Sequence, residues 1–294
     1  MKKIIFEGCG TAISTPFTET GVNYETFGKM IEDQISGNID AIIVCGTTGE
    51  SSTMTKEERK EAIKFVVDKV GGRTKVIAGT GGNNTIEAIE MSKYANKLGV
   101  DGLLVVTPYY NKTSQEGLIA HYKAIASEVD VPIILYNVPS RTGLNIKPET
   151  CLELSKIDNI VAIKEASGNI SQVAKIASLC KDNLTIYSGN DDQIIPVLSL
   201  GGKGVISVLS NIMPNYTHEM VKKYLEGNVL EATKMQLEAL DLIESLFVEV
   251  NPTPVKYALN ELGYDYGKPR LPLVEPTEAS KQKIKTCMKK HGLK

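Results

Sequence analysis

Eight short apolar segments, each followed by an amphipathic stretch, constrain the fold of this chain more than any other feature of its sequence. They consist mainly of Val, Ile, Leu and Ala, without the alternating polar residues of a half-exposed strand. Such runs are typical of strands that are buried on both faces, as in a parallel sheet. The predicted strands are residues 10–15, 40–45, 75–79, 102–107, 132–136, 160–164, 184–188 and 204–207.

Eight strands that alternate with helices over residues 1–226 predict an α/β fold, the (β/α)8 TIM barrel. The competing fold is a doubly wound open sheet, which usually has fewer strands and a glycine-rich turn after the first one. Here residues 14–18 read Ser-Thr-Pro-Phe-Thr, and Asn84 stands where the later Gly-x-Gly pattern needs its third glycine. The barrel is therefore the preferred prediction.

A helical region, residues 227–294, is expected after the barrel, with no strand in it. Its helical patterns cover residues 230–248, 253–262 and 277–290. Within the barrel, Thr55 and Thr113 are each followed three residues later by Glu, which predicts a capping box at each place. Pro148 suits the first position of a helix.

Composition excludes several classes of function. The net charge is −2, so we expect no nucleic-acid or anionic-membrane partner, and no apolar run is long enough to span a bilayer. Five scattered cysteines form no Cys-x-x-Cys pair, which favours a reducing cytoplasm over a disulfide framework. Three histidines lie far apart, so a histidine-ligated metal is not expected either.

Lys164 ends the predicted strand 160–164. At the end of a buried strand its ammonium would lie where the sheet meets a cavity or solvent. In a dry cavity the amine loses its proton more readily and becomes a nucleophile towards carbonyl groups. The alternative is a lysine that extends from the core to bulk water, which is common, and this segment alone does not separate the two interpretations.

The other strand ends supply groups that suit imine chemistry. Catalytic groups of such barrels lie at the carboxyl ends of the strands. Here one amine, three phenols, hydroxyl groups and one guanidinium are expected there, without metal ligands. A lysine could attack a keto acid, a phenol and a hydroxyl could move protons, and an arginine could bind a carboxylate. Besides Lys164, the candidates are Thr47, Thr48, Tyr109, Tyr110, Tyr136, Arg141, Gly189 and Ile206.

Each of these residues also has a purely structural interpretation. The hydroxyls of Thr47 and Thr48 could satisfy loop backbone groups. Tyr109 and Tyr110 could be a packing pair at a subunit interface. Arg141 could form a surface ion pair, and Gly189 could supply a positive φ angle. The expectation of catalysis rests on their coincidence at one rim of the barrel.

Four motifs at these strand ends resemble a known family. They are Gly-Thr-Thr-Gly-Glu at 46–50, Thr-Pro-Tyr-Tyr-Asn at 107–111, Tyr-Asn-Val-Pro-Ser-Arg-Thr-Gly at 136–143 and Ile-Lys-Glu at 163–165. With Asn-Pro-Thr-Pro-Val-Lys at 251–256, they are similar to the dihydrodipicolinate synthases over essentially the whole chain. These belong to the pyruvate-dependent Schiff-base aldolases, which include N-acetylneuraminate lyase.

The resemblance implies that Lys164 forms an imine with pyruvate and that no other cofactor or metal is needed. It implies that Tyr136 shuttles protons in a relay with Thr48 and Tyr110. Tyr110 would come from the neighbouring subunit of a homotetramer built as a dimer of dimers. Thr47 and Thr48 would bind the pyruvate carboxylate.

The resemblance further implies that the backbone at Gly189 and Ile206 lines the pocket. Arg141 would bind the carboxylate of L-aspartate 4-semialdehyde, and the product would be 4-hydroxy-tetrahydrodipicolinate, in lysine and diaminopimelate biosynthesis. The alternative is another pyruvate aldolase of the family, such as N-acetylneuraminate lyase or a 2-keto-3-deoxy sugar acid aldolase. Arg141 favours the first, because an arginine fork suits an anionic aldehyde.

Lysine-inhibited members of the family bind lysine at a dimer interface. The corresponding positions in this chain are Ser51, Ser52, Lys56, Arg59, Asn83, Glu87 and Tyr109. Lys56 and Arg59 replace polar or histidine side chains there. Two cations beside a cationic effector predict little or no inhibition by lysine.

Overall fold

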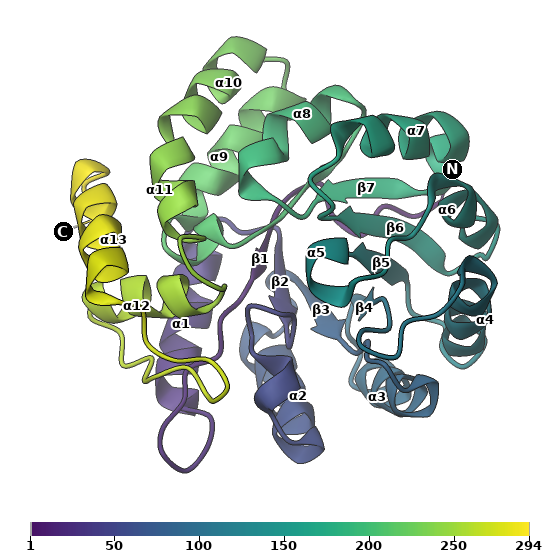
Figure 1. Ribbon diagram of the computed structural model, residues 1–294, viewed down its shortest axis with the longest axis horizontal. Coiled ribbons are helices and arrows are strands. Elements are labelled where there is room, and N and C mark those ends of the chain that lie inside the picture. The colour runs from purple at the N-terminus through teal and green to yellow at the C-terminus, as the bar shows by residue number, and fades with distance from the viewer. Residues whose placement is uncertain (1, 294) are drawn as a thin grey trace.

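The computed structural model of the chain describes residues 2–293 and contains a closed barrel of eight parallel strands (Figure 1). Each strand pairs with the next one in sequence, and β8 closes the barrel by pairing with β1. The predicted α/β barrel is thereby confirmed. The strands are β1 (Gly8–Ala12), β2 (Ala41–Val44), β3 (Lys75–Gly79), β4 (Gly102–Val106), β5 (Ile133–Asn137), β6 (Ile160–Glu165), β7 (Thr185–Ser188) and β8 (Gly204–Ser207).

Helices surround the barrel and connect successive strands (Figure 1). Those up to the last barrel helix are α1 (Tyr24–Ser36), α2 (Lys56–Val70), α3 (Thr85–Lys97), α4 (Gln115–Ala126), α5 (Pro139–Thr142), α6 (Pro148–Leu154), α7 (Ile170–Cys180), α8 (Ile194–Ser199) and α9 (Pro214–Leu225). Short 3-10 helices are η1 (Ser51–Thr53), η2 (Lys181–Asn183), η3 (Asp191–Gln193) and η4 (Leu209–Asn211).

Both faces of the strands are buried, which is why the sequence shows no polar alternation. One set of strand residues fills the barrel interior, among them Ile43, Leu104, Ile134, Tyr136 and Ile206. The alternate set packs outwards against the helices. Inward positions at the carboxyl ends of the strands therefore face the mouth of the barrel.

The first strand was predicted at residues 10–15 but runs from Gly8 to Ala12, so that prediction is wrong by two to three residues. Its start lies against β8, where Gly8 pairs with Gly204. A Cβ on Gly204 would lie 2.0 Å from the carbonyl oxygen of Gly8. The glycines here allow a close approach of two strands and do not belong to a loop. The prediction therefore placed the start of the strand too late.

Helix starts are partly as predicted. Thr55 and Glu58 form the expected capping box of α2, and Pro148 is the first residue of α6. The box expected at Thr113 is wrong, because α4 begins one residue later and Ser114 caps it by accepting from the backbone N–H of Gly117. Nothing in the local sequence distinguishes the two hydroxyl residues.

The region after Leu225 contains only helices within the described residues: α10 (Val229–Glu238), α11 (Leu240–Ser245), α12 (Thr253–Glu261) and α13 (Glu278–Lys290). The prediction of a single helix over 230–248 is wrong, because the helix is interrupted at Ala239, between the end of α10 and the start of α11. No Pro or Gly marks the break. Packing explains it, because α10 lies on α9 whereas α11 lies on α13.

The C-terminal helices lie on one side of the barrel, and the segment after α12 returns to its mouth (Figure 1). There the hydroxyl of Tyr266 donates to the carbonyl of Ser14 at 3.0 Å, and the N–H of Phe17 donates to the carbonyl of Tyr266. The C-terminal region therefore contributes to the mouth of the barrel. Within residues 2–293, none of the helices has the length and apolar character needed to cross a membrane.

Candidate active site

Lys164 and Tyr136 are neighbours at the mouth of the barrel. The register of β5 and β6 pairs the two residues directly, and Tyr136 belongs to the inward set of side chains. The ammonium of Lys164 lies over the ring of Tyr136, 4.6 Å from its centroid. Both residues are nearly buried, with exposures of 5% and 6%. The side chain of Lys164 thus stays at the barrel mouth and does not extend to bulk solvent.

The ammonium of Lys164 has a further property that suits a nucleophile. Within residues 2–293 it makes no ion pair: it lies over the ring of Tyr136, and the buried carboxylate of Asp191 interacts with its charge from beyond ion-pair distance. The pair therefore offers an amine and a phenol side by side, the groups that imine formation and proton transfer require.

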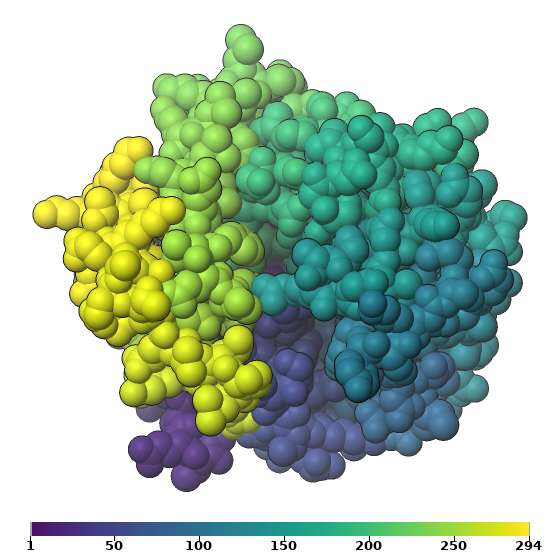
Figure 2. Space-filling model, viewed as in Figure 1, coloured from purple at the N-terminus to yellow at the C-terminus, as the bar shows by residue number. Residues whose placement is uncertain are grey.

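A cavity of about 220 Å³ opens at the mouth of the barrel, and its lining includes Thr47, Val138 and Arg141. A second hollow of about 40 Å³ shares Thr47 with it and reaches Tyr136. Figure 2 shows a recess near the centre of the face, with purple atoms of the N-terminal part of the chain at its floor. The larger cavity has room for a small organic acid.

Thr48 is held by a residue of the C-terminal region. Its hydroxyl accepts a hydrogen bond from the side-chain amide of Asn251 at 3.0 Å, and Thr48 is 3% exposed. The backbone carbonyl of Asn251 accepts from the guanidinium of Arg141 at 3.2 Å. The second polar atom of the Asn251 side chain, Oδ1, is buried without a partner.

Asn251 thus joins two of the predicted site residues, and the sequence did not identify it. The Asn-Pro-Thr-Pro motif was used only as part of the family resemblance. Its one useful signal was that the family resemblance extends over this motif. The long sequence separation from Thr48 explains why spacing alone gave no indication.

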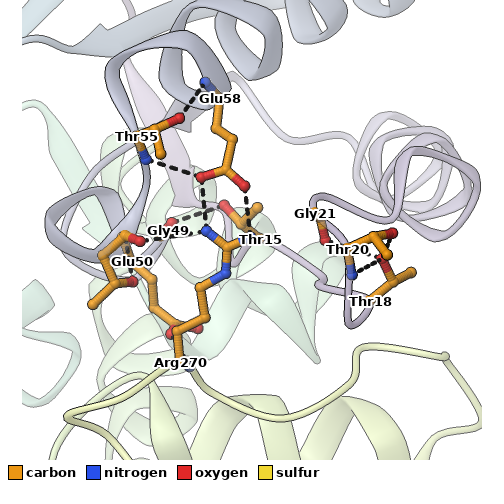
Figure 3. A network of polar contacts seen from close by, with 10 residues as sticks. Thr15, Thr18, Thr20, Gly21, Gly49, Glu50, Thr55, Glu58 and Arg270 are labelled. Atoms are coloured by element: carbon orange, nitrogen blue, oxygen red, sulfur yellow. Dashed lines mark hydrogen bonds and ion pairs between the residues drawn. The ribbon is translucent and has the colours of Figure 1, made fainter.

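The loop of residues 46–50 is fixed by buried charge. Glu50 has a φ of +54° and is almost completely buried, and its Oε1 lies 2.7 Å from the ammonium of Lys256. Its other oxygen accepts from the backbone N–H of Arg270 at 2.9 Å. The Arg270 guanidinium faces both carboxylate oxygens of Glu58, at 2.6 and 2.7 Å (Figure 3).

This arrangement also has an electrostatic consequence at the start of α2. The hydrogen bonds from Arg270 lower the pKa of Glu58 below its usual value. Glu58 therefore stays ionised while it caps α2 and holds the C-terminal segment against the loop. Thr47 and Thr48 lie on a loop whose far end, Glu50, is held by its ion pair with Lys256.

Arg141 and Tyr110 are exposed, unlike Lys164 and Tyr136. Arg141 lies in α5 and, within residues 2–293, has no carboxylate partner, which argues against its structural interpretation as a surface ion pair. Tyr110 is 91% exposed and has a φ of +70°. Within its own chain Tyr110 therefore points to solvent and does not reach the buried pair.

Gly189 and Ile206 lie at the ends of β7 and β8. Ile206 is fully buried in the barrel interior. Gly189 does not have the positive φ of its structural interpretation; instead, a Cβ there would lie 2.5 Å from the Cβ of Ala166. Glycine is needed here for close approach, and its N–H donates to the carbonyl of Glu165 at 2.8 Å.

Asp191 is a buried carboxylate near the site that the sequence analysis missed. Its Oδ2 accepts from the backbone N–H groups of Val208 and Leu209, both at 2.9 Å, while Oδ1 is buried without a partner. Burial raises its pKa, and the charge of Lys164 opposes that rise. No motif marks it, because an aspartate after a strand usually caps a turn.

The expected effector positions divide into two groups. Ser51, Ser52, Arg59 and Tyr109 line the cavity of about 220 Å³. The ammonium of Lys56, by contrast, pairs with Glu90. Asn83 lies at the cavity edge, where its side-chain amide donates to the backbone carbonyl of Tyr109 at 3.2 Å, and Glu87 is in the first turn of α3.

Comparison with known proteins agrees with this geometry. Residues 5–291 match the model of the dihydrodipicolinate synthetase family, and the chain belongs to that family. It is 57% identical to a 4-hydroxy-tetrahydrodipicolinate synthase of Acetivibrio thermocellus, over 100% of both chains.

Solved structures give the same result. Dihydrodipicolinate synthase of Thermotoga maritima is 41% identical with a TM-score of 0.97, covering 99% of this chain and 100% of that one. An enzyme of this type from Cyanidioschyzon merolae, solved with lysine bound, is 44% identical with a TM-score of 0.96, covering 99% and 100%.

Proposed function

We propose that the protein is a lyase that condenses pyruvate with L-aspartate 4-semialdehyde to give 4-hydroxy-tetrahydrodipicolinate, for lysine and diaminopimelate biosynthesis. The observation that carries this proposal is the unpaired, buried ammonium of Lys164 over the ring of Tyr136. The full-length similarity to enzymes of that name supports the same substrates. Another pyruvate aldolase, such as N-acetylneuraminate lyase, is not favoured by these relatives.

In the proposed mechanism the Lys164 amine attacks the ketone carbon of pyruvate, and water leaves as the imine forms. Loss of a proton from the methyl carbon gives an enamine, which attacks the aldehyde carbon of the second substrate. The amine of that substrate then displaces Lys164 from the imine carbon, and the six-membered ring closes. Tyr136 carries protons between these steps, in a proposed relay with the Thr48 hydroxyl.

Substrate carboxylates are bound at the edge of the site. Thr47 and Thr48 are placed to receive the carboxylate of pyruvate, with the backbone at Gly189 and Ile206 closing the pocket. Arg141 lines the cavity, and its guanidinium forms no ion pair with a carboxylate of the described chain. Its planar fork suits the carboxylate of the semialdehyde.

We also propose a homotetramer, a dimer of dimers, in which Tyr110 completes the relay of a neighbouring subunit. Its support is an exposed aromatic side chain near the mouth that its own chain does not use, together with Ile86, which is 68% exposed. Exposed apolar side chains that form a contiguous patch commonly mark an interface with a partner. Sedimentation with wild type and Tyr110→Asp would test the assembly.

No metal or other cofactor is proposed, because the imine itself withdraws the electrons that the reaction must move. We expect the protein to act in the cytoplasm, consistent with five free cysteines, four of them buried. Treatment with EDTA should leave turnover unchanged. Loss of activity that returns with a divalent metal would contradict this part of the proposal.

The substrate assignment is tested by pairing pyruvate with either L-aspartate 4-semialdehyde or N-acetylmannosamine. Wild type should use the first and not the second. Arg141→Ala should lower kcat/KM for the semialdehyde roughly 10- to 100-fold, the range of one charge-assisted contact. Arg73→Ala is the matched control, since Arg73 pairs with Glu32 on the outer surface. Unchanged use of the semialdehyde by Arg141→Ala would contradict the assignment.

A further inference from the structure

A polar cluster lies directly behind the catalytic pair. In the register of β5 and β6, Asn137 pairs with Glu165 one residue beyond the pairing of Tyr136 with Lys164. Because side chains alternate along a strand, Asn137 and Glu165 point away from the barrel interior that Tyr136 faces. The two pairs are thus on opposite faces of the same two strand ends.

Every contact that Glu165 makes is with a donor. It is 3% exposed, and its Oε1 accepts from the backbone N–H of Ser167 at 2.8 Å. Its Oε2 accepts from the side-chain amide of Gln172 at 3.2 Å, and Asn137 Nδ2 lies 3.0 and 3.2 Å from the two oxygens. A site made of donors fits a carboxylate and not an amide.

Asn137 extends the cluster towards the segment after α5. Its Oδ1 accepts from the backbone N–H of Ile146 at 2.9 Å, and its Nδ2 also donates to Asn145 Oδ1 at 2.8 Å. Asn145 and Gln172 exchange hydrogen bonds at 2.7 and 3.1 Å. The cluster therefore joins β5, β6, α7 and the chain that returns from Arg141.

We propose that Glu165 and Asn137 are positioning residues, which fix the ends of β5 and β6 so that Lys164 and Tyr136 keep their reactive geometry. This inference rests on the proposed role of Lys164. Neither residue touches the reacting atoms. A displacement of about 1 Å at a reacting group can lower a rate roughly 100-fold, so a rigid support behind the pair has a large effect.

The alternative is that the cluster contributes only to stability, as buried polar networks often do. The two roles differ in what a mutation changes. A stabilising residue alters the unfolding transition and leaves the reaction of the folded protein as it was. A positioning residue alters the rate at which the folded protein forms its imine.

The test is Glu165→Gln, assayed by the initial rate of borohydride-trapped pyruvate adduct and by thermal unfolding. The amide NH₂ of the new glutamine would face the hydrogen-bond donors that now contact the Glu165 carboxylate. We therefore expect trapping to slow about 10- to 100-fold. The double variant Glu165→Gln, Gln172→Glu moves the carboxylate from position 165 to position 172 within the cluster. Asn145 and the new amide at position 165 can both donate to it, and trapping should recover at least tenfold.

Asn159→Ala is the matched control. Asn159 precedes the opposite end of β6, where its amide donates to the carbonyls of Ala126 and Val129 at 2.9 and 2.7 Å. Its loss should lower the unfolding temperature and leave the trapping rate of the folded protein unchanged. If Glu165→Gln does not fold, Gln172→Ala carries the test, because it removes one donor from Glu165 at a half-buried helix position.

Trapping at the wild-type rate by folded Glu165→Gln, or by Gln172→Ala in its place, would overturn the positioning role. So would a double variant that regains stability without regaining the trapping rate. Wild-type protein that forms no adduct would overturn the proposed function as well, so the two failures are distinguishable. Slow trapping that the carboxylate exchange restores would support the proposal.

Discussion

Two of the lysines within residues 2–293 are buried, and their surroundings differ in one respect. Lys256 is 1% exposed and its ammonium lies 2.7 Å from Glu50 Oε1. Lys164 is 5% exposed and lies over Tyr136 without any carboxylate in ion-pair contact within residues 2–293. Both ammonium groups lie over an aromatic ring, since Lys256 is 4.3 Å from the centroid of Phe17. The difference is therefore the carboxylate and not the ring.

The comparison separates a structural lysine from a reactive one. Burial lowers the pKa of Lys256, and Glu50 opposes that effect, so the pair keeps its charge and joins α12 to the loop of Thr47 and Thr48. Lys164 has no carboxylate in ion-pair contact and lies beside Tyr136 at the mouth of the barrel. Lys256 thus fixes the structure of the site, whereas Lys164, in our proposal, is the lysine that reacts.

The largest expected effect is that of Lys164→Ala. Removing the nucleophile should lower turnover by several orders of magnitude, because no other group of the site can form the imine. The unfolding transition should change little, as the lysine makes no ion pair. Steady-state assays and thermal unfolding check both. An active Lys164→Ala variant would contradict the distinction between a reactive Lys164 and a structural Lys256.

Tyr136→Phe should have the next largest effect. It keeps a ring beneath the ammonium but removes the hydroxyl, and loss of a proton carrier lowers kcat by roughly 100-fold or more. Tyr187→Phe is the matched control, because its hydroxyl donates to the carbonyl of Phe6 inside the same barrel. Equal kcat losses in the two variants would mean that the hydroxyl of Tyr136 has only a structural role.

Lys256→Met should act on stability. It leaves Glu50 buried without its cation, so the free energy of unfolding should fall by about 3–5 kcal/mol, measured with denaturant. Adding Glu50→Gln should restore part of that loss, since no charge then remains unpaired. A Lys256→Met variant with unchanged stability would show that Glu50 and Lys256 are not coupled.

Free lysine should have the smallest effect. The cavity that Ser51, Ser52, Arg59 and Tyr109 line also includes Arg141 and has no carboxylate among its lining residues, so an added ammonium meets two guanidinium groups there and no anion. Millimolar lysine should leave turnover unchanged. Arg59→Ala should increase sensitivity, whereas Lys56→Ala should not, because Lys56 already pairs with Glu90. Strong inhibition of wild type would contradict this prediction.

The sequence predicted the barrel because eight buried strands leave a simple signal, a run of apolar residues without alternation. It placed Lys164 and Tyr136 at strand ends for the same reason, and register brought them together. Strand β1 was misplaced because glycines serve close approach there as well as turns. The break at Ala239 was missed because packing on two different helices has no local signal.

The contacts made from the C-terminal region could not be predicted. Asn251 meets Thr48, and Lys256 meets Glu50, across about two hundred residues of chain. Sequence spacing cannot reveal such pairs, because the fold of the whole barrel decides where the C-terminal helices return. For the same reason, Lys56 and Arg59 looked equivalent in sequence although the structure turns only Arg59 towards the cavity.

The central claim is that the unpaired lysine is the reactive one. Reduction of the pyruvate complex with borohydride, followed by peptide mass mapping, tests it directly. We predict one reduced adduct, on the peptide that contains Lys164, and none on the peptide that contains Lys256. An adduct on any other lysine, or no adduct at all, would contradict the account.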